Sequence, residues 1–207
     1  MSAENYLGVK YPSLEEILEV MEEKNYRIFS NEAKGFNLNL VGVRTPEIDA
    51  NEFDDFICVF YRSNDNWVFV AFRSTTDPGA YWLKNPMNKM GTAIVKEGQY
   101  KSLWKKGKHL GKYDALVQNK PITVYRDADR DEYLDTENSE EETGLFGINL
   151  HRASEHRESD DVNKWSAGCQ VVACPLQFNY LMQLVDKSAE RYGDSFTYTL
   201  INFSDFY

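Results

Sequence analysis

The chain has 207 residues, of which 42% are hydrophobic and 14% are aromatic. This composition is typical of a globular protein with a sizeable buried core, and it argues against extended disorder. The formal net charge of −10 argues against non-specific binding to nucleic acid or to an anionic membrane surface. It equally argues against recognition of an anionic polymer by simple charge attraction.

No apolar run in the sequence approaches the length of a membrane-spanning helix. The segment from Met1 to Lys10 has neither a basic start nor an apolar core, so we expect no secretory signal there. The sequence contains no internal repeat and no low-complexity linker. We therefore expect one domain over residues 1–207, with residues 1–30 as a possible helical appendage.

The first predicted element is a helix that begins after Pro12. Ser13 can cap this helix, and Glu16 can complete a capping box. Apolar residues then share one face of the helix, which we expect to end near Lys24–Tyr26. The next predicted element is a strand over residues 37–44, where apolar residues alternate.

Two predicted strands over residues 56–62 and 67–73 flank a turn-rich tetrapeptide, a pattern that indicates a β-hairpin. Residues 78–98 are punctuated by glycine and proline, so we expect an ordered long loop with one short helix. Residues 99–108 show a mixed pattern that does not decide the element type. Further strands are predicted over residues 122–126, 145–151 and 196–202.

The last predicted helix opens at Pro175 and runs to about Tyr192, where Gly193 is a stop signal. Strands therefore dominate the middle of the chain, and helices are expected toward both ends. Together these elements predict an α+β fold, a single β-rich domain with an N-terminal helix and a C-terminal helix.

The three cysteines are too few, and odd in number, for a disulfide framework. Cys58 lies within an apolar run and is predicted to be a buried small hydrophobe. Cys174 precedes a proline and is also predicted to be structural. Cys169 alone has the neighbours of a reactive thiol, because it follows a tight turn of small residues.

His151 stands at the end of an apolar run, and Cys169 follows it eighteen positions later. A thiol is a competent nucleophile only as the thiolate, so it needs a base or a positive neighbour. His151 can be that base, and backbone N–H groups of the turn can bind the oxyanion of a tetrahedral intermediate. The pair predicts cysteine catalysis, whereas an isolated His at a strand end would predict only a partly buried side chain.

This arrangement resembles the catalytic motif of the L,D-transpeptidase family of peptidoglycan enzymes. In that family a His at the end of a strand is followed by a variable loop and then by Ser/Thr-x-Gly-Cys. The matching residues here are His151, Ser166, Gly168 and Cys169, and the spacing fits. The resemblance covers roughly the last third of the chain. Upstream, residues 75–79 look like a scrambled form of the family's Thr-Pro-x-Gly turn.

Two positions depart from the family's pattern. Ala167 stands where the family usually has a second His, and Val171 stands where it usually has an Arg or Asn. Both positions help shape the substrate site in the family, so the fine specificity is left open. Both also favour an alternative from another class, a structural or wall-binding module, such as a virion component, that has the fold without the catalytic rate.

The resemblance implies a cysteine enzyme that acts on peptidoglycan stem peptides. Cys169 would attack the carbonyl of an L-configured centre next to a D-residue, leaving a thioester. His151 would be the base, held by the backbone carbonyl of Arg152, and it should lower the pKa of the thiol. The backbone of Gly168 would contribute to the oxyanion hole. An amine acceptor makes a transpeptidase, and water makes a carboxypeptidase or endopeptidase; nothing in the sequence fixes the acceptor.

Four residues are predicted to contact substrate: Ser166, Gln170, His109 and Tyr113. For Ser166, a hydrogen bond within its own turn is an equally good interpretation. His109 lies in a glycine-flanked loop beside Tyr113, where it either lines a substrate cleft or lies on the surface. His156 belongs to the charged loop between His151 and the cysteine turn and is expected to be exposed.

An acidic run in the sequence matches part of a calcium motif. Carboxylates at its first, third, fifth and ninth positions copy the start of a Ca²⁺-binding loop: Asp127, Asp129, Asp131 and Asp135. Two requirements fail, because Glu132 occupies the sixth position, where glycine is wanted, and Asn138 the twelfth, where glutamate is wanted. A solvated acidic loop is the competing interpretation.

A zinc hydrolase is the rival chemistry, with His109, His151 and Cys169 as conceivable ligands. Neither a His-x-x-x-His nor a Cys-x-x-Cys spacing is present, so we expect no metal and no other cofactor in the reaction. The expected partners are peptidoglycan stem peptides, with no nucleic acid and no membrane, and the oligomeric state is left open.

An enzyme of the cell wall has to reach the wall, and the sequence shows no obvious signal for export. We expect the chain to stay in the cytoplasm until it is released at lysis, carried in a virion or exported by a dedicated secretion machine. A phage origin would explain the first two routes, and cutting rather than cross-linking would then be the expected reaction.

Overall fold

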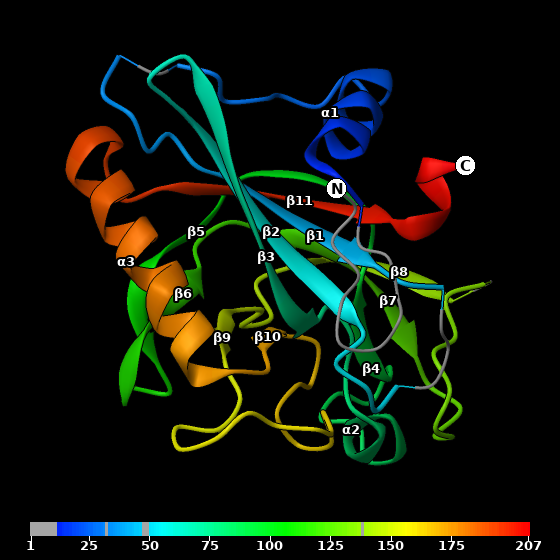
Figure 1. Cartoon of the computed structure of the whole chain (residues 1–207). Helices are drawn as coiled ribbons and strands as arrows, with labels where there is room; N and C mark the ends of the chain where they lie inside the picture. Colours follow the sequence, from blue (N-terminus) through cyan, green and yellow to red (C-terminus); the bar gives the residue numbers. More distant parts are fainter. Residues whose placement is uncertain (1–11, 32, 47–49, 138) are drawn as a thin grey trace.

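The computed structural model describes the chain except residues 1–11, 32, 47–49 and 138 (Figure 1). The predictions for residues 1–10 and for Asn138 therefore lie outside the described chain. The described residues form a β-rich domain with helices toward both ends, which confirms the predicted α+β class. No helix among these residues is long and apolar enough to cross a membrane.

Eight strands close into a barrel in the order β1-β11-β5-β6-β9-β10-β3-β2. Around the barrel they are β1 (Asn39–Arg44), β11 (Phe196–Asn202), β5 (Gly98–His109), β6 (Tyr113–Gln118), β9 (Leu150–Arg152), β10 (Gln170–Val172), β3 (Asn66–Thr75) and β2 (Asp55–Ser63). Most neighbours are antiparallel, but β1 pairs with β11, and β9 with β10, in parallel. A separate three-stranded sheet holds β4 (Thr92–Val95), β7 (Ile122–Asp127) and β8 (Glu140–Gly144).

The helices are α1 (Leu14–Glu23), α2 (Ala80–Lys84), α3 (Pro175–Tyr192) and a short 3₁₀ helix, η1 (Phe203–Phe206). Helix α1 lies next to η1, near the labelled C-terminus (Figure 1). Helix α3 packs on the side of the barrel that carries β9 and β10.

Three apolar clusters lie among the described residues. The largest joins the barrel interior to α3, whose Phe178, Leu181 and Val185 are at most 2% exposed. The second joins the buried face of α1, including Ile17, to strands β1 and β2, and the third packs against Cys169. Burying a large aliphatic or aromatic side chain stabilises a fold by about 1.5–3 kcal/mol, so this packing fixes both helices on the barrel.

Several predicted elements are confirmed. Helix α1 starts with the capping box, in which Ser13 and Glu16 exchange hydrogen bonds with each other's backbone. Helix α3 ends at Gly193, whose φ of 85° suits glycine. The β2–β3 hairpin turns at Asn64 and Asp65, which have φ angles of 48° and 62°, the left-handed conformation that a tight hairpin turn needs.

The strand predicted over residues 145–151 is wrong over most of its length, since β9 contains only Leu150–Arg152. Gly147 has a φ of 79°, which breaks an extended backbone. The backbone N–H groups of residues 146–148 donate to the side chain of Gln118, at 2.8–2.9 Å from its Oε1, instead of to a neighbouring strand. Leu145, at the start of this segment, is 67% exposed, so its apolar character does not mark a buried strand.

Four strands were not predicted: β4, β6, β8 and β10. Strand β4 lies in the segment predicted as a loop with one short helix, and the helix is α2. Residues 99–108, whose pattern was mixed, belong to the twelve-residue strand β5. This strand pairs with β11 on one side and β6 on the other, so its two halves face different surroundings.

Strands β9 and β10 pair in parallel, and the region around this pair, with the residues just before each strand, forms one corner of the barrel. Val171 lies opposite His151, and Gln170 opposite Leu150. Cys169, directly before β10, is therefore brought beside the start of β9. A single bridge between β6 and β9 adds the end of the β5–β6 hairpin to the same corner, which brings His109 near. Sheet pairing, rather than sequence proximity, thus brings the strand that carries His151 beside the strand that follows Cys169.

Candidate active site

The turn before Cys169 is held by its own serine. Ser166 is fully buried, its hydroxyl donates to the carbonyl of Cys169 at 2.7 Å, and it accepts the N–H of Gly168 at 3.1 Å. The interpretation of Ser166 as a substrate contact is therefore corrected: both of these bonds stay within the turn. Gly168 has a φ of 118°, and a Cβ there would lie 2.5 Å from the carbonyl oxygen of Ala93.

The predicted oxyanion role of Gly168 also needs correction. Its N–H is already donated to Ser166, so it is not available to a substrate oxygen. Among the described residues, the N–H of Cys169 itself has no acceptor, and it is attached to the nucleophile's own residue. The N–H of Cys169 is therefore the donor that this turn offers to an oxyanion.

The sulfur of Cys169 is half-buried and touches the backbone on both sides of Ile148. It receives the N–H of Asn149 at 3.4 Å and lies 3.5 Å from the carbonyl oxygen of Gly147. Burial raises the pKa of this thiol to about 11, and the Asn149 N–H only partly opposes that. The expected lowering of the thiol pKa is absent, so the resting sulfur is a thiol.

The other two cysteines have different surroundings. Cys58 is fully buried within β2, as predicted, and burial raises the pKa of its thiol. Cys174 is half-buried at the N-cap position of α3. Neither cysteine carries the turn geometry of Cys169.

His151 is 3% exposed and held in one orientation. Its Nδ1 lies 2.7 Å from the carbonyl oxygen of Arg152, so Nδ1 carries the proton and donates it. The contact that the family resemblance assigns to Arg152 is thus present. Burial, followed by His109, lowers the pKa of His151 to about 3, so the ring is neutral with Nε2 as a free acceptor.

Tyr113 supports the same carbonyl rather than standing apart as a substrate contact. Its hydroxyl donates to the Arg152 carbonyl at 3.1 Å and lies 3.4 Å from His151 Nδ1. The guanidinium of Arg152 covers the Tyr113 ring at 4.0 Å from its centroid. Burial raises the pKa of Tyr113 to about 12, so its hydroxyl stays a donor.

His109 is the last residue of β5 rather than a loop residue, and its half-buried ring stacks on His151. The two ring centroids are 3.9 Å apart and the planes differ by 23°. Asn149, which sequence reasoning missed, holds His109: its Nδ2 lies 3.2 Å from His109 Nδ1. No local pattern marks this contact, because the two residues are forty positions apart. His156, as predicted, is exposed.

Gln170 lies behind the cysteine turn, with no exposed surface. Its Nε2 donates to the carbonyl of Thr76 at 3.1 Å and approaches that of Gly168 at 3.4 Å, while its Oε1 accepts the Tyr198 hydroxyl at 2.5 Å. The predicted contact with substrate is therefore replaced by a structural contact: Gln170 supports the turn from inside the barrel.

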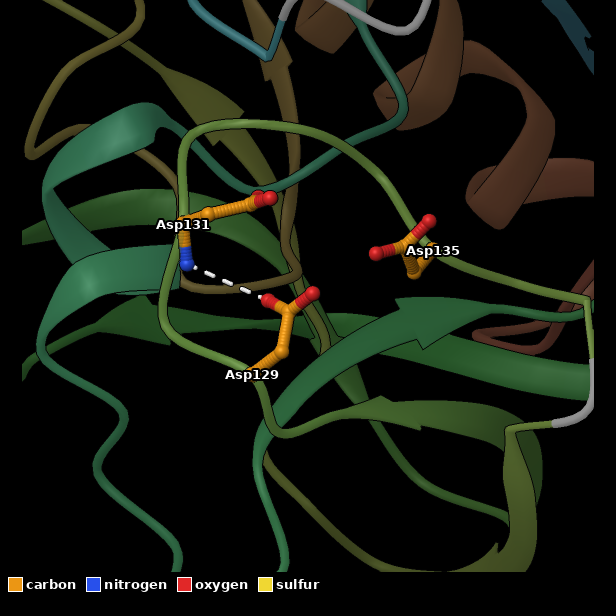
Figure 2. A group of neighbouring side chains, drawn as sticks. All are labelled: Asp129, Asp131 and Asp135. Carbon is orange, nitrogen blue, oxygen red and sulfur yellow. Dashed lines mark hydrogen bonds between the residues drawn. The ribbon is translucent and has the colours of Figure 1, made fainter.

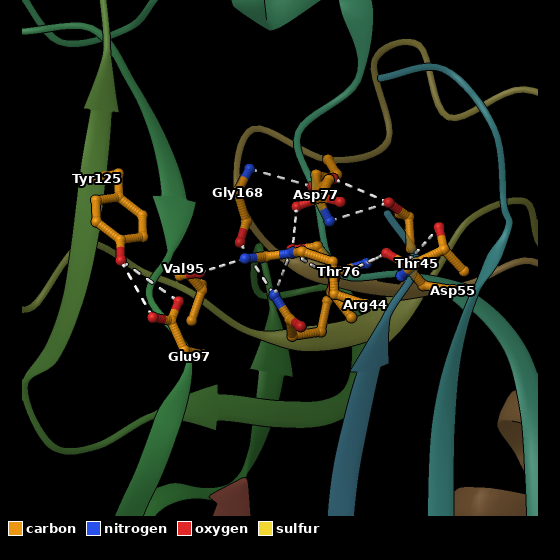
Figure 3. Close-up of polar contacts among 12 residues, drawn as sticks. Arg44, Thr45, Asp55, Thr76, Asp77, Val95, Glu97, Tyr125 and Gly168 are labelled. Carbon is orange, nitrogen blue, oxygen red and sulfur yellow. Dashed lines mark hydrogen bonds and ion pairs between the residues drawn. The ribbon is translucent and has the colours of Figure 1, made fainter. Parts of the chain in front are cut away.

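A buried polar network continues this support (Figure 3). The Arg44 guanidinium donates to Thr76 and to the carbonyl of Val95, and it forms an ion pair with Asp77 at 2.8 Å. Asp55 accepts the N–H and hydroxyl of Thr76 at 2.7 and 2.8 Å. The segment resembling a family turn, residues 75–79, is thereby fixed beneath the cysteine turn, and Gly79 donates its N–H to the Ser166 carbonyl at 2.9 Å.

The acidic run forms a loop after β7 in which three of the four predicted carboxylates meet (Figure 2). Oxygen atoms of Asp129, Asp131 and Asp135 lie within 4.8 Å of one another, and all three residues are exposed. Asp127 does not belong to this group: it is 1% exposed, and burial raises its pKa to about 6. Calcium binding stays a prediction for this loop.

The zinc alternative is not supported by the geometry. Among the described residues, the aspartate group is the one set of three ligand atoms that close together, and His109, His151 and Cys169 form no such set. The corner therefore holds a half-buried thiol, a neutral imidazole and the N–H of Cys169.

Comparisons with protein-family models, with curated proteins and with solved structures found no match to this chain.

Proposed function

We propose that this protein is a cysteine-dependent enzyme that cuts or transfers stem peptides of peptidoglycan, in the manner of L,D-transpeptidases. The observation that carries the proposal is the orientation of His151. Its Nδ1–H is fixed on the Arg152 carbonyl beside the strand that begins directly after Cys169. A neutral imidazole held through Nδ1, on the strand that pairs with the one after a Ser-x-Gly-Cys turn, fits acyl transfer. The substrate class comes from the family resemblance.

The first half-reaction starts from a neutral thiol and a neutral imidazole. With thiol and imidazole pKa values of about 11 and about 3, a resting ion pair is disfavoured, so the proton moves as the S–C bond forms. Cys169 Sγ attacks the carbonyl carbon of the L-centre, and His151 Nε2 takes the thiol proton. The oxyanion accepts the N–H of Cys169.

The intermediate collapses when the C–N bond to the D-residue breaks. His151 returns the proton to the leaving amine, and a thioester to Cys169 remains. Water or an amine then attacks the thioester carbon, giving up a proton to His151, and the thiol leaves with that proton. With water the product is a shortened stem peptide, and with an amine it is a new peptide bond.

The test is digestion of purified muropeptides by wild-type protein, with products identified by mass spectrometry. Cys169→Ala should abolish turnover, while Cys174→Ala, which removes another half-buried thiol, should keep it. Circular dichroism should show that both variants fold. Turnover by Cys169→Ala at the wild-type rate, or no product from the wild-type protein, would contradict the proposal. Incorporation of ¹⁸O from labelled water separates hydrolysis from transfer.

A second candidate is a wall-binding or virion module with the same fold and no turnover. The observation that favours it is Val171, which is fully buried and so offers nothing to a substrate where the family usually has a polar residue. Stem-peptide binding with micromolar to millimolar affinity by a wild-type protein that forms no product would support this candidate over the enzyme.

A further inference from the structure

Asn149 connects His109, one of the two stacked imidazoles, to the barrel. Its Oδ1 accepts the backbone N–H of Gln118 at 2.9 Å, which fixes the orientation of the amide. The other end of the amide, Nδ2, then faces His109 Nδ1 at 3.2 Å. An amide nitrogen only donates, so His109 Nδ1 has to be the acceptor, and the single proton of this ring lies on Nε2.

A doubly protonated His109 is incompatible with this contact. Its Nδ1–H and the Nδ2–H of Asn149 would be two donors facing each other, since the Gln118 N–H prevents the amide from rotating to present its oxygen. Burial and the nearby charge of Lys112 also lower the pKa of His109. The hydrogen-bond pattern and the electrostatics favour the same neutral tautomer.

The state of His109 matters because its ring lies 3.9 Å from that of His151. In the reaction proposed above, His151 takes the thiol proton and becomes an imidazolium. A positive charge on His109 would oppose this step at short range, because like charges disfavour each other. A neutral ring leaves His151 free to carry the one proton that the reaction moves.

We propose that Asn149 and His109 are positioning residues that keep the second imidazole neutral, with its proton on Nε2, so that the stacked pair accepts one proton and accepts it on His151. This inference rests on the proposed function, because it takes His151 as the base. It assigns His109 a role that acts through His151 rather than on the substrate.

The charged neighbours of the pair do not change this assignment. On the β5–β6 hairpin, Lys108 is paired with Asp114 at 2.9 Å, which leaves Lys112 as the charge acting on His109. On the β9 side, Arg152 lies 3.5 Å from Glu155 and lowers the pKa of His151 further.

The two remaining titratable groups that face the pair are Tyr113 and Cys169. Burial raises the pKa of both, so both are uncharged at neutral pH. Helix α3 contributes Phe178, which packs edge-on against Tyr113 and does not titrate.

The experiment is nitrogen NMR of the full chain with ¹⁵N-labelled histidine, which is feasible because the chain has three histidines. His156→Gln and His109→Gln assign the signals. In the wild-type protein, His109 should show the Nε2–H tautomer and should take up its second proton at a lower pH than an ordinary His. An ordinary His would be half-protonated near pH 6.5.

Asn149→Asp is the matched perturbation. The new carboxylate still accepts the Gln118 N–H, but its other oxygen accepts a proton from His109 Nδ1. The pKa of His109 should rise by about one unit or more, the usual effect of an adjacent opposite charge. The acid limb of activity should move to higher pH. Asn66→Asp, at an exposed position on β3, adds the same charge. It should change neither the pKa of His109 nor the acid limb of activity.

A wild-type His109 that titrates near pH 6.5, or that carries its proton on Nδ1, overturns this inference whether or not the protein is active. Unchanged His109 signals in a folded Asn149→Asp variant overturn it as well. Failure of the proposed function looks different: turnover that survives in Cys169→Ala would refute the nucleophile while leaving the His109 spectrum as described.

Discussion

In the corner that holds His151 and Cys169, the side chains of Asn149 and Gln170 have partners far along the chain, whereas the acidic loop after β7 is held mainly by near neighbours. Asn149 bonds to His109 forty residues away, and Gln170 bonds to Thr76 ninety-four residues away. In the loop, Asp131 donates its N–H to Asp129, two residues before it. The corner exists only in the folded barrel, while the loop forms most of its contacts by itself.

This difference has a consequence for charge. Burial in the corner raises the pKa of the Cys169 thiol and lowers the pKa of His151 and of His109, so it favours the uncharged form of each group. In the loop, three carboxylates stay exposed side by side and attract counter-charge from solvent. A neutral, pre-oriented corner suits proton transfer, and an exposed acidic loop suits at most a weakly held cation.

The largest expected effect comes from breaking the corner at His151. Loss of a general base typically costs about 10²–10⁴-fold in rate, so His151→Ala should lose at least that much stem-peptide turnover. His156→Ala removes an exposed imidazole and should keep the wild-type rate. Equal rates for the two variants would mean that the base is elsewhere.

The next effect comes from the turn glycine. Gly168→Ala places a Cβ 2.5 Å from the Ala93 carbonyl and forces a side chain into a positive φ, which alone costs about 1–2 kcal/mol. The variant should lose more than this in free energy of unfolding, together with activity. Gly193→Ala shares the positive φ but has open space around the new Cβ, so thermal unfolding of the pair isolates the packing cost. Equal losses would show that the turn relaxes.

The sequence predicts the two residues proposed for catalysis, but it does not predict the hydrogen bonds that hold them in place. His151 and Cys169 were identifiable because their spacing and flanks form a pattern, and helices α1 and α3 because caps and periodicity are local signals. The roles of Gln170 and Asn149 depend on strands that pair across the barrel, and no local signal reports such partners. The thiol pKa was misjudged for the same reason, since burial is set by the whole fold.

A pH profile sharpens the comparison further. Because the pKa of His151 is about 3, the base stays unprotonated throughout mildly acidic pH, and activity should be flat from about pH 5 to pH 8. The same shift affects stability: between pH 6.5 and pH 3 the unfolded chain binds a proton that the native His151 does not, so stability falls as pH falls through this range. An activity limb near pH 6.5 would show an ordinary imidazole instead.

The smallest expected effect concerns the acidic loop. Calcium should bind with a dissociation constant on the order of 10⁻⁴–10⁻³ M, since the loop lacks the glycine and glutamate of strong sites. Isothermal titration calorimetry should detect the heat of calcium binding. Asp131→Asn should abolish this heat, while Asp65→Asn, in the hairpin turn, should leave it unchanged. Absence of heat and of a thermal shift at 10 mM calcium would leave a solvated acidic loop.

The most direct test of the central claim, that Cys169 is a nucleophile served by His151, is covalent trapping. A carbapenem-type β-lactam should acylate the wild-type protein once, with the adduct mapped to Cys169 by intact mass and peptide mass spectrometry. The adduct should persist in Cys174→Ala, be absent in Cys169→Ala, and form far more slowly in His151→Ala. A wild-type protein that forms no adduct, or an adduct that maps to Cys174, would contradict the account.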